Sequence, residues 1–230
     1  MLYKKPNQRM TEELKFLDKF LESGYFDNLE NDKFNLTFIQ EPFTQVGYAD
    51  LVCIRWDNEI KDKWVTSRNE LVPNDIKILH HLYNCRIYKE VDDIVRELGF
   101  SYKKVNETLL RLSDADLLIS NKTRKVKIRP IKEIFFVNEI IAIEAKLKNW
   151  KIALNQSVNN VSFASKSFSL FPDKAINYNL LENYKKTDVG VLSFNKKCRE
   201  VVKPKKQKIP TAITSWYFNE YIGRNCCPTC

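Results

Sequence analysis

One apolar stretch decides the fold: residues 141–147 have the sequence IAIEAKL. Successive side chains of a β-strand point to opposite faces of its sheet. Alternation therefore sends both isoleucines, Ala145 and Leu147 to one face and puts Glu144 and Lys146 on the other. A carboxylate and an ammonium group are thus expected two residues apart on one side of a strand whose other side belongs to the core.

A second strand-like stretch, residues 49–54 with the sequence ADLVCI, carries another charge beside an apolar run. Asp50 shares a face with Val52 and Ile54. Burying a carboxylate without a partner is costly, whereas a divalent cation between Asp50 and Glu144 neutralises both, with Lys146 beside it to orient an attacking water. This hypothesis requires the two carboxylates to lie within about 6 Å of each other on the same side of the sheet.

The surrounding sequence predicts strands that alternate with helices. Thr11 is placed to cap a helix that runs to about Ser23, and Gly24 ends it. β-Branched and aromatic runs predict strands at 34–39, 48–56, 135–147, 167–171 and 189–194, the first two forming a hairpin. Apolar spacing predicts helices at 150–165 and 174–184, the first with an apolar face of Trp150, Leu154, Val158 and Val161. This order indicates an α/β sheet.

Between residues 70 and 130 the pattern changes to short helices with polar caps. Pro73 suits the first turn of one helix, Gly99 ends a second over 88–98, and Ser101 caps a third over 102–112. A polar turn at 121–124 then separates two strand-like segments. Three helices followed by a β-hairpin is the order of a winged helix-turn-helix.

These patterns predict an α/β core interrupted by an insertion. We expect residues 1–68 and 131–208 to form the core, 69–130 the winged helix-turn-helix and 209–230 a C-terminal extension. The basic stretch 196–208 has seven Lys or Arg and one Glu, and is expected to be a solvated loop that can add phosphate contacts. The CxxC at Cys227–Cys230 lacks a second ligand pair with zinc-site spacing, so a free terminus is expected.

Charge and scarce residue types narrow the function. The net charge of +9 attracts polyanions, of which nucleic acid is the leading candidate and an anionic membrane the rival. The N-terminus lacks the apolar stretch of a secretory signal and no run is long enough to span a membrane, so a cytoplasmic protein is expected. Five dispersed glycines form neither a Walker loop nor a dinucleotide-binding cluster.

Histidine and cysteine offer little for catalysis in this sequence. The only two histidines, His80 and His81, are adjacent in a predicted helix, which makes a Ser-His-Asp triad or a His-rich metal site hard to build. Cys53, Cys85 and Cys198 stand alone and are expected to be small buried or half-buried thiols. Oxygen ligands and a metal-activated water need no histidine base, which fits this composition.

Asp50 after Gly47-Tyr48-Ala49, followed by Glu144-Ala145-Lys146 on the next core strand, resembles the PD-(D/E)XK nuclease superfamily over roughly residues 10–60 and 135–195. The resemblance implies a restriction-endonuclease-like core and Mg²⁺- or Mn²⁺-dependent phosphodiester hydrolysis. It implies Asp50 and Glu144 as metal ligands and Lys146 as the catalytic lysine. Some branches carry a glutamine on the following helix, here Gln156, and a tyrosine four residues later, where this chain has Asn160.

Many branches of this superfamily also use a glutamate of the first helix. Glu13 is the choice here over Glu12. The alternative for the whole motif is structural: Glu144 and Lys146 form an ion pair at a sheet end, and Asp50 caps a turn. In the same way, Gln156 and Glu13 can be ordinary solvated helix residues.

The insertion supplies the candidate DNA contacts. Residues 101–129 hold eight Lys or Arg and three acids, a net charge of +5. The third helix is the candidate recognition helix and the hairpin the wing, so the helix reads bases while the wing binds phosphates. The candidate contact residues are Tyr102, Lys103, Asn106, Arg111, Lys122, Arg124, Lys125 and Lys127. Protein docking, or a purely structural role for the insertion, is the alternative.

The sequence therefore predicts a metal-dependent DNA endonuclease-like enzyme acting on duplex DNA. The main alternative is a DNA-binding regulator on a nuclease-like fold without turnover. A third reading is a module of a defence or repair assembly that acts only with a protein partner. A homodimer is compatible with all three, since two sites cut two strands most easily.

Overall fold

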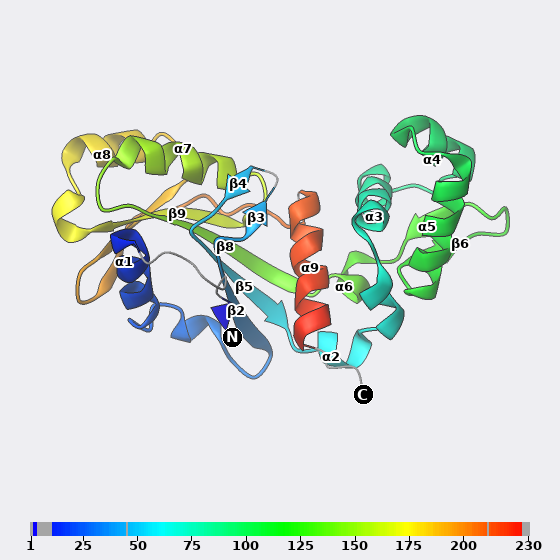
Figure 1. Ribbon diagram of the computed structural model, residues 1–230, viewed down its shortest axis with the longest axis horizontal. Helices are drawn as coiled ribbons and strands as arrows, with labels where there is room; N and C mark the ends of the chain where they lie inside the picture. Colours follow the sequence, from blue (N-terminus) through cyan, green and yellow to red (C-terminus); the bar gives the residue numbers. More distant parts are fainter. Residues whose placement is uncertain (1, 4–10, 45, 211, 227–230) are drawn as a thin grey trace. The chain divides into compact units, whose positions relative to one another are not determined.

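The computed structural model describes residues 2–3, 11–44, 46–210 and 212–226, and the chain forms two compact units (Figure 1). The first unit comprises residues 1–57 and 137–215, and the second residues 58–136 and 216–230. No helix of the described residues is long and apolar enough to cross a membrane.

The first unit is built on a mixed sheet of seven strands in the order β1-β2-β5-β8-β9-β10-β11. Antiparallel pairs join β5 to β2 and β8, while β8, β9 and β10 run parallel. Their bounds are β1 (Leu2–Tyr3), β2 (Phe34–Gln40), β5 (Leu51–Asp57), β8 (Val137–Ala145), β9 (Lys166–Pro172), β10 (Gly190–Phe194) and β11 (Cys198–Val202). A short ladder of β3 (Phe43–Thr44) and β4 (Gly47–Tyr48) lies between β2 and β5 in the chain.

Helices cover both faces of this sheet (Figure 1). On one face α1 (Glu12–Leu21), capped by the Thr11 side chain, buries Leu17 and Phe20 against the sheet. On the other face lie α7 (Trp150–Asn160) and α8 (Tyr178–Tyr184), with an apolar cluster around Phe171. Two 3-10 turns, η1 (Asp27–Leu29) and η3 (Asp173–Ala175), complete the unit. The prediction of an α/β sheet flanked by helices is confirmed.

The second unit is mainly helical. Its elements are α2 (Ile60–Lys63), η2 (Thr66–Glu70), α3 (Pro73–Cys85), α4 (Val91–Leu98), α5 (Tyr102–Asp114), the hairpin of β6 (Leu118–Ser120) and β7 (Val126–Ile128), α6 (Ile131–Ile134) and residues from 216 onward of α9 (Ile213–Cys226). The predicted caps are confirmed: Pro73 opens α3, Gly99 closes α4 in the left-handed conformation, and Ser101 accepts from the backbone of α5. A helical insertion is thus confirmed.

The bounds of the second unit differ from the predicted 69–130 because α9 packs into it. The guanidinium of Arg68 and the carboxylate of Glu220 form a buried ion pair, and the Asn219 side chain accepts the backbone N–H of Phe136. These contacts join 216–226 to the inserted segment, where a separate extension from 209 was expected. Residues 227–230, which hold the predicted CxxC, lie outside the described residues.

Several predicted elements have different ends or faces. The predicted 88–98 helix begins at Val91, because the backbone of Lys89 pairs with Val126 of the hairpin. The predicted 150–165 helix ends at Asn160 and faces inward with Ala153, Ser157 and Asn160, whereas Val158 of the predicted apolar face is 45% exposed. The basic stretch 196–208, expected to be a loop, contains the edge strand β11.

Candidate functional site

Strand pairing brings the two predicted carboxylates together at one end of the sheet. Leu51 pairs with Ile143, which sets Asp50 beside Glu144 in the register of β5 and β8. The backbone N–H of Ala145 donates to Oδ2 of Asp50 at 2.8 Å. Asp50 and Glu144 also interact directly through their side chains. The two groups therefore lie on the same side of the sheet, as the metal hypothesis requires.

Lys146 follows the end of β8, and its ammonium group joins three oxygens. Its Nζ is 3.2 Å from Oδ2 of Asp50, 3.3 Å from Oε2 of Glu13 and 3.1 Å from the carbonyl of Ala145. Burial lowers the pKa of Lys146, but the charges of Asp50 and Glu13 outweigh burial and raise it. The lysine therefore stays protonated at neutral pH. Glu13, from α1, reaches the cluster through this lysine.

Glu144 is fully buried, and the two oxygens of its carboxylate have different surroundings. Oε1 accepts a hydrogen bond of 2.7 Å from the Asn160 amide, while Oε2 has no donor within the described part of the chain. Burial and the neighbouring Asp50 raise the pKa of Glu144 to about 8. Burial also raises the pKa of Asp50, although Lys146 opposes this effect. Because half-buried Asp50 neighbours buried Glu144, the pair favours holding one proton between them unless a cation replaces it.

A polar network on the α7 and α8 side surrounds Glu144. Ser169 of β9 pairs with Glu144 in the sheet, and its hydroxyl is 2.7 Å from the hydroxyl of Ser157. The Tyr184 hydroxyl donates to the same Ser169 oxygen at 2.7 Å. From the sequence, Asn160 stood out only as the residue in place of a tyrosine, and the rest of the network could not be recognised. Polar residues at positions 157 and 160, spaced to share the inward face of a helix, were the available signal.

Gln156 does not join the cluster by any hydrogen bond that the structure records. Its side-chain oxygen is enclosed and has no donor among the described residues. The enclosed, unpartnered oxygens of Gln156 and Glu144 are unusual, because buried polar atoms in proteins almost always have a partner. Either oxygen can accept from a bound water or coordinate a cation.

The donor set suits a hard divalent cation. Asp50 and Glu144 offer carboxylate oxygens, and magnesium or manganese takes one or two carboxylates and completes its shell with waters and substrate phosphate. Oε2 of Glu144, which has no hydrogen-bond donor among the described residues, can take either a proton shared with Asp50 or a cation. The site therefore has the chemistry to hold Mg²⁺ or Mn²⁺.

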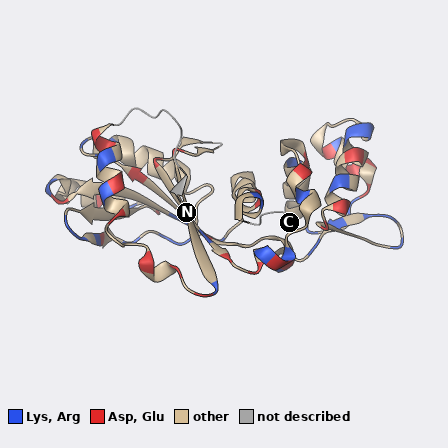
Figure 2. Ribbon diagram, turned by 60° about the horizontal axis from the view of Figure 1, so that its bottom comes forward, with Lys and Arg blue, Asp and Glu red and all other residues tan. Residues whose placement is uncertain are grey.

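The candidate DNA-contact residues of the second unit differ in whether other side chains already hold them. Arg111 is held by Asp75, a buried carboxylate to which it donates at 2.9 Å and 2.7 Å. Lys125 pairs with Glu90 at 2.9 Å, and Lys127 lies over the Tyr88 ring. Three candidate cations are exposed: Lys103 on α5, and Lys122 and Arg124 in the hairpin. Figure 2 shows the Lys and Arg residues of the chain in blue.

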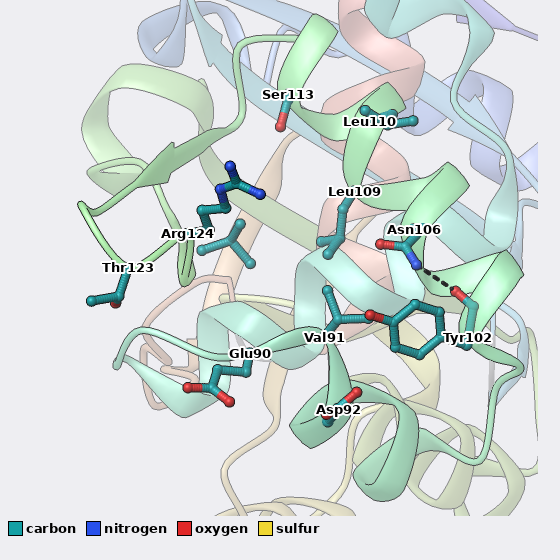
Figure 3. Close-up of a pocket in the computed structure, with 11 residues that line it drawn as sticks. Glu90, Val91, Asp92, Tyr102, Asn106, Leu109, Leu110, Ser113, Thr123 and Arg124 are labelled. Atoms are coloured by element: carbon teal, nitrogen blue, oxygen red, sulfur yellow. Dashed lines mark hydrogen bonds between the residues drawn. The ribbon is translucent and has the colours of Figure 1, made fainter.

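A hollow of about 640 Å³ lies between α5, the start of α4 and the hairpin (Figure 3). Tyr102 and Asn106 of α5 line it together with Arg124 of the hairpin, and the Asn106 amide donates to the backbone carbonyl of Tyr102. Glu90 and Asp92 line the opposite wall. This wall of the hollow is therefore acidic, although Lys125 pairs with Glu90.

No known family model, curated protein or solved structure matches this chain. Functional inference therefore rests on the residues described above.

Proposed function

We propose that the chain is a metal-dependent nuclease that hydrolyses phosphodiester bonds of DNA, with a restriction-endonuclease-like core and a winged helix-turn-helix insertion. The observation that carries the proposal is the cluster of half-buried Asp50, buried Glu144 and Lys146, in which one Glu144 oxygen has no donor among the residues that the structure describes. Asp50 and Glu144 would hold Mg²⁺ or Mn²⁺. When bound, such an ion supplies Lewis acidity and lowers the pKa of a coordinated water.

Lys146 has the properties of an electrostatic catalyst. The charges of Asp50 and Glu13 raise its pKa, which favours the ammonium form. A fixed ammonium beside the scissile phosphate stabilises the negative charge that develops in the transition state. Glu13 holds this ammonium from α1, and Asn160 holds Glu144 from α7, so both act as positioning residues.

The second unit supports the DNA-binding part of the proposal. Its three helices and hairpin follow the order of a winged helix, and α5 takes the place of the recognition helix. Exposed cations at Lys103, Lys122 and Arg124 suit phosphate contacts, which make binding sensitive to salt. Arg111 is excluded from direct base recognition in this proposal because Asp75 holds it.

One observation favours the alternative of a DNA-binding regulator without turnover. The ammonium of Lys146 already bridges Asp50 and Glu13, so a cation stands beside the carboxylates in the absence of metal. A lysine that remains there neutralises Asp50 and weakens the demand for a divalent ion. This alternative predicts DNA binding without cleavage.

Cleavage of supercoiled and linear duplex DNA in Mg²⁺ and Mn²⁺ distinguishes the two functions. Lys146→Ala is expected to lower the cleavage rate by about 10²-fold or more, as loss of one transition-state donor does, with DNA affinity unchanged. Lys166→Ala is the matched control, since Lys166 is also an ion-paired lysine of the sheet, bonded to Glu139. Binding is measured by fluorescence anisotropy with a chelator present. Equal cleavage by wild type and Lys146→Ala, or DNA binding without cleavage, would reject the enzyme.

A further inference from the structure

Three metal-ligating side chains from α3 and α4 meet in the second unit. His81 and Cys85 lie one turn apart on α3, and Glu97 comes from α4. Nε2 of His81 is 2.8 Å from Oε2 of Glu97 and 3.5 Å from Sγ of Cys85. Within the ranges that the structure describes, this is the one group of three His, Cys, Asp or Glu ligand atoms within 4.8 Å of one another.

The spacing fits a tetrahedral transition metal. Zinc binds nitrogen at about 2.0 Å and sulfur at about 2.3 Å, so a tetrahedral ion holds the two atoms about 3.5 Å apart. The separation of His81 Nε2 and Cys85 Sγ has this value without adjustment. The nitrogen and the Glu97 oxygen, now hydrogen-bonded, need to separate by about 0.5 Å. His81 and Glu97 are partly exposed, so an ion can enter from solvent.

We propose that His81, Cys85 and Glu97 bind a zinc-class divalent ion, a site independent of the proposed nuclease centre. Only three protein ligands converge here in the described residues, and zinc sites with three protein ligands keep an open position for water or another ligand. The site is therefore exchangeable, in contrast to the closed four-ligand sites that hold small domains together. From the sequence, a His-rich metal site looked hard to build because the only two histidines, His80 and His81, are adjacent; the fold brings Glu97, 16 residues from His81, beside it.

Lys89 is the main group that disfavours binding of the ion. Its Nζ is 2.5 Å from Oε1 of Glu97, which leaves Oε2 for a metal but puts a positive charge nearby. The ion also displaces the thiol proton of Cys85, which passes to solvent as the sulfur–metal bond forms. The nearby charge of Lys89 and the loss of the thiol proton both weaken metal binding. The negative charges of Glu97 and the Cys85 thiolate offset them. Binding should therefore strengthen as pH rises.

Metal at this position would link α3 to α4. The backbone of Lys89, between these helices, pairs with Val126 of β7, so the same connection also reaches the hairpin. An ion that binds only the folded state stabilises it by mass action. The proposed consequence is a second unit whose stability rises with zinc.

Cobalt titration of the metal-free full-length protein tests the proposal, because a cysteine ligand gives a near-ultraviolet thiolate-to-cobalt charge-transfer band and an all-oxygen site does not. We expect one equivalent of cobalt to produce the band, and zinc to displace it. Cys85→Ser should abolish the band, and Glu97→Gln should weaken binding by about tenfold or more, as loss of even an outer-shell partner does. Glu97→Gln also serves as the milder variant if Cys85→Ser does not fold.

Neighbouring residues provide matched controls. His80→Asn, on the same helix, and Cys198→Ser, a half-buried thiol of the first unit, should keep both the band and the affinity. The combined replacement of Cys226, Cys227 and Cys230 by serine should also keep them. A band that survives in Cys85→Ser, or that disappears with the three C-terminal cysteines, overturns the proposal, as does the absence of any band in the wild type.

Discussion

Replacing Glu144 by glutamine should make the metal-free protein more stable. Glutamine has the same shape, and its oxygen can still accept the hydrogen bond from Asn160. Its amide nitrogen takes the place of the oxygen that has no donor and can donate to Asp50. The substitution therefore removes a repulsion between two carboxylates and adds a hydrogen bond.

The pKa of Glu144 sets the size and sign of the effect. Its value rises from 4.5 to about 8 on folding, and a unit of pKa corresponds to about 1.4 kcal/mol, so ionised Glu144 destabilises the fold by at most about 5 kcal/mol. Because the folded state holds this proton more tightly than the unfolded state, the contribution of Glu144 to stability falls as pH rises from 4.5 to about 8. Relaxation of the site reduces the effect, and we expect Glu144→Gln to gain about 2 kcal/mol above pH 8 and little near pH 5.

Urea denaturation with a chelator, at about pH 5, 7 and 9, measures this gain. The matched control is Glu139→Gln, on the same strand and equally buried, where Lys166 and Lys206 compensate the carboxylate. That control should gain no stability at pH 9, because the ion pairs with Lys166 and Lys206 already compensate the Glu139 carboxylate. If Glu144→Gln is less stable than wild type at pH 9, Glu144 is a structural ion-pair residue and the reasoning is refuted.

The remaining predictions concern the second unit. Arg111→Met should lower its stability by about 2–3 kcal/mol in urea denaturation, because buried Asp75 loses its partner; an unchanged midpoint would show that Asp75 needs no counter-charge. Lys103→Met, on the same helix but 86% exposed, should change stability by less than about 0.5 kcal/mol while weakening DNA binding by anisotropy, and unaltered affinity would remove α5 from the interface. Gly223→Ala should cost about 1–3 kcal/mol in thermal or urea unfolding, because its Cβ would lie 2.0 Å from the Trp64 ring; a neutral result would mean that this ring can move.

The elements that depend on residues close together in the chain could be predicted from the sequence. Caps at Thr11, Pro73 and Ser101 and the alternation of β8 depend on neighbouring residues, and they predicted the elements around the candidate site. Trp150, Leu154 and Val161 of the predicted α7 face pack against the apolar cluster, but Val158 is exposed. Ser157 and Asn160 turn inward instead, where they bond Ser169 and Glu144. The pairing of Arg111 with buried Asp75 could not be predicted from the sequence either. An arginine off the apolar stripe looks free until the fold brings a buried aspartate 36 residues away beside it.

The polar surroundings of Glu144 argue for a role beyond stability. The same side of the sheet has an apolar cluster around Phe171 and Val191, so this layer can be packed without charge. Buried ionic groups can often be replaced by apolar ones with no loss of stability. A buried carboxylate whose pKa is raised to about 8, and whose second oxygen has no donor in the described part of the chain, is instead a destabilising element. Such strain is expected where a protein keeps a group for a ligand, and here the cation that relieves it would be the one that the proposed reaction needs.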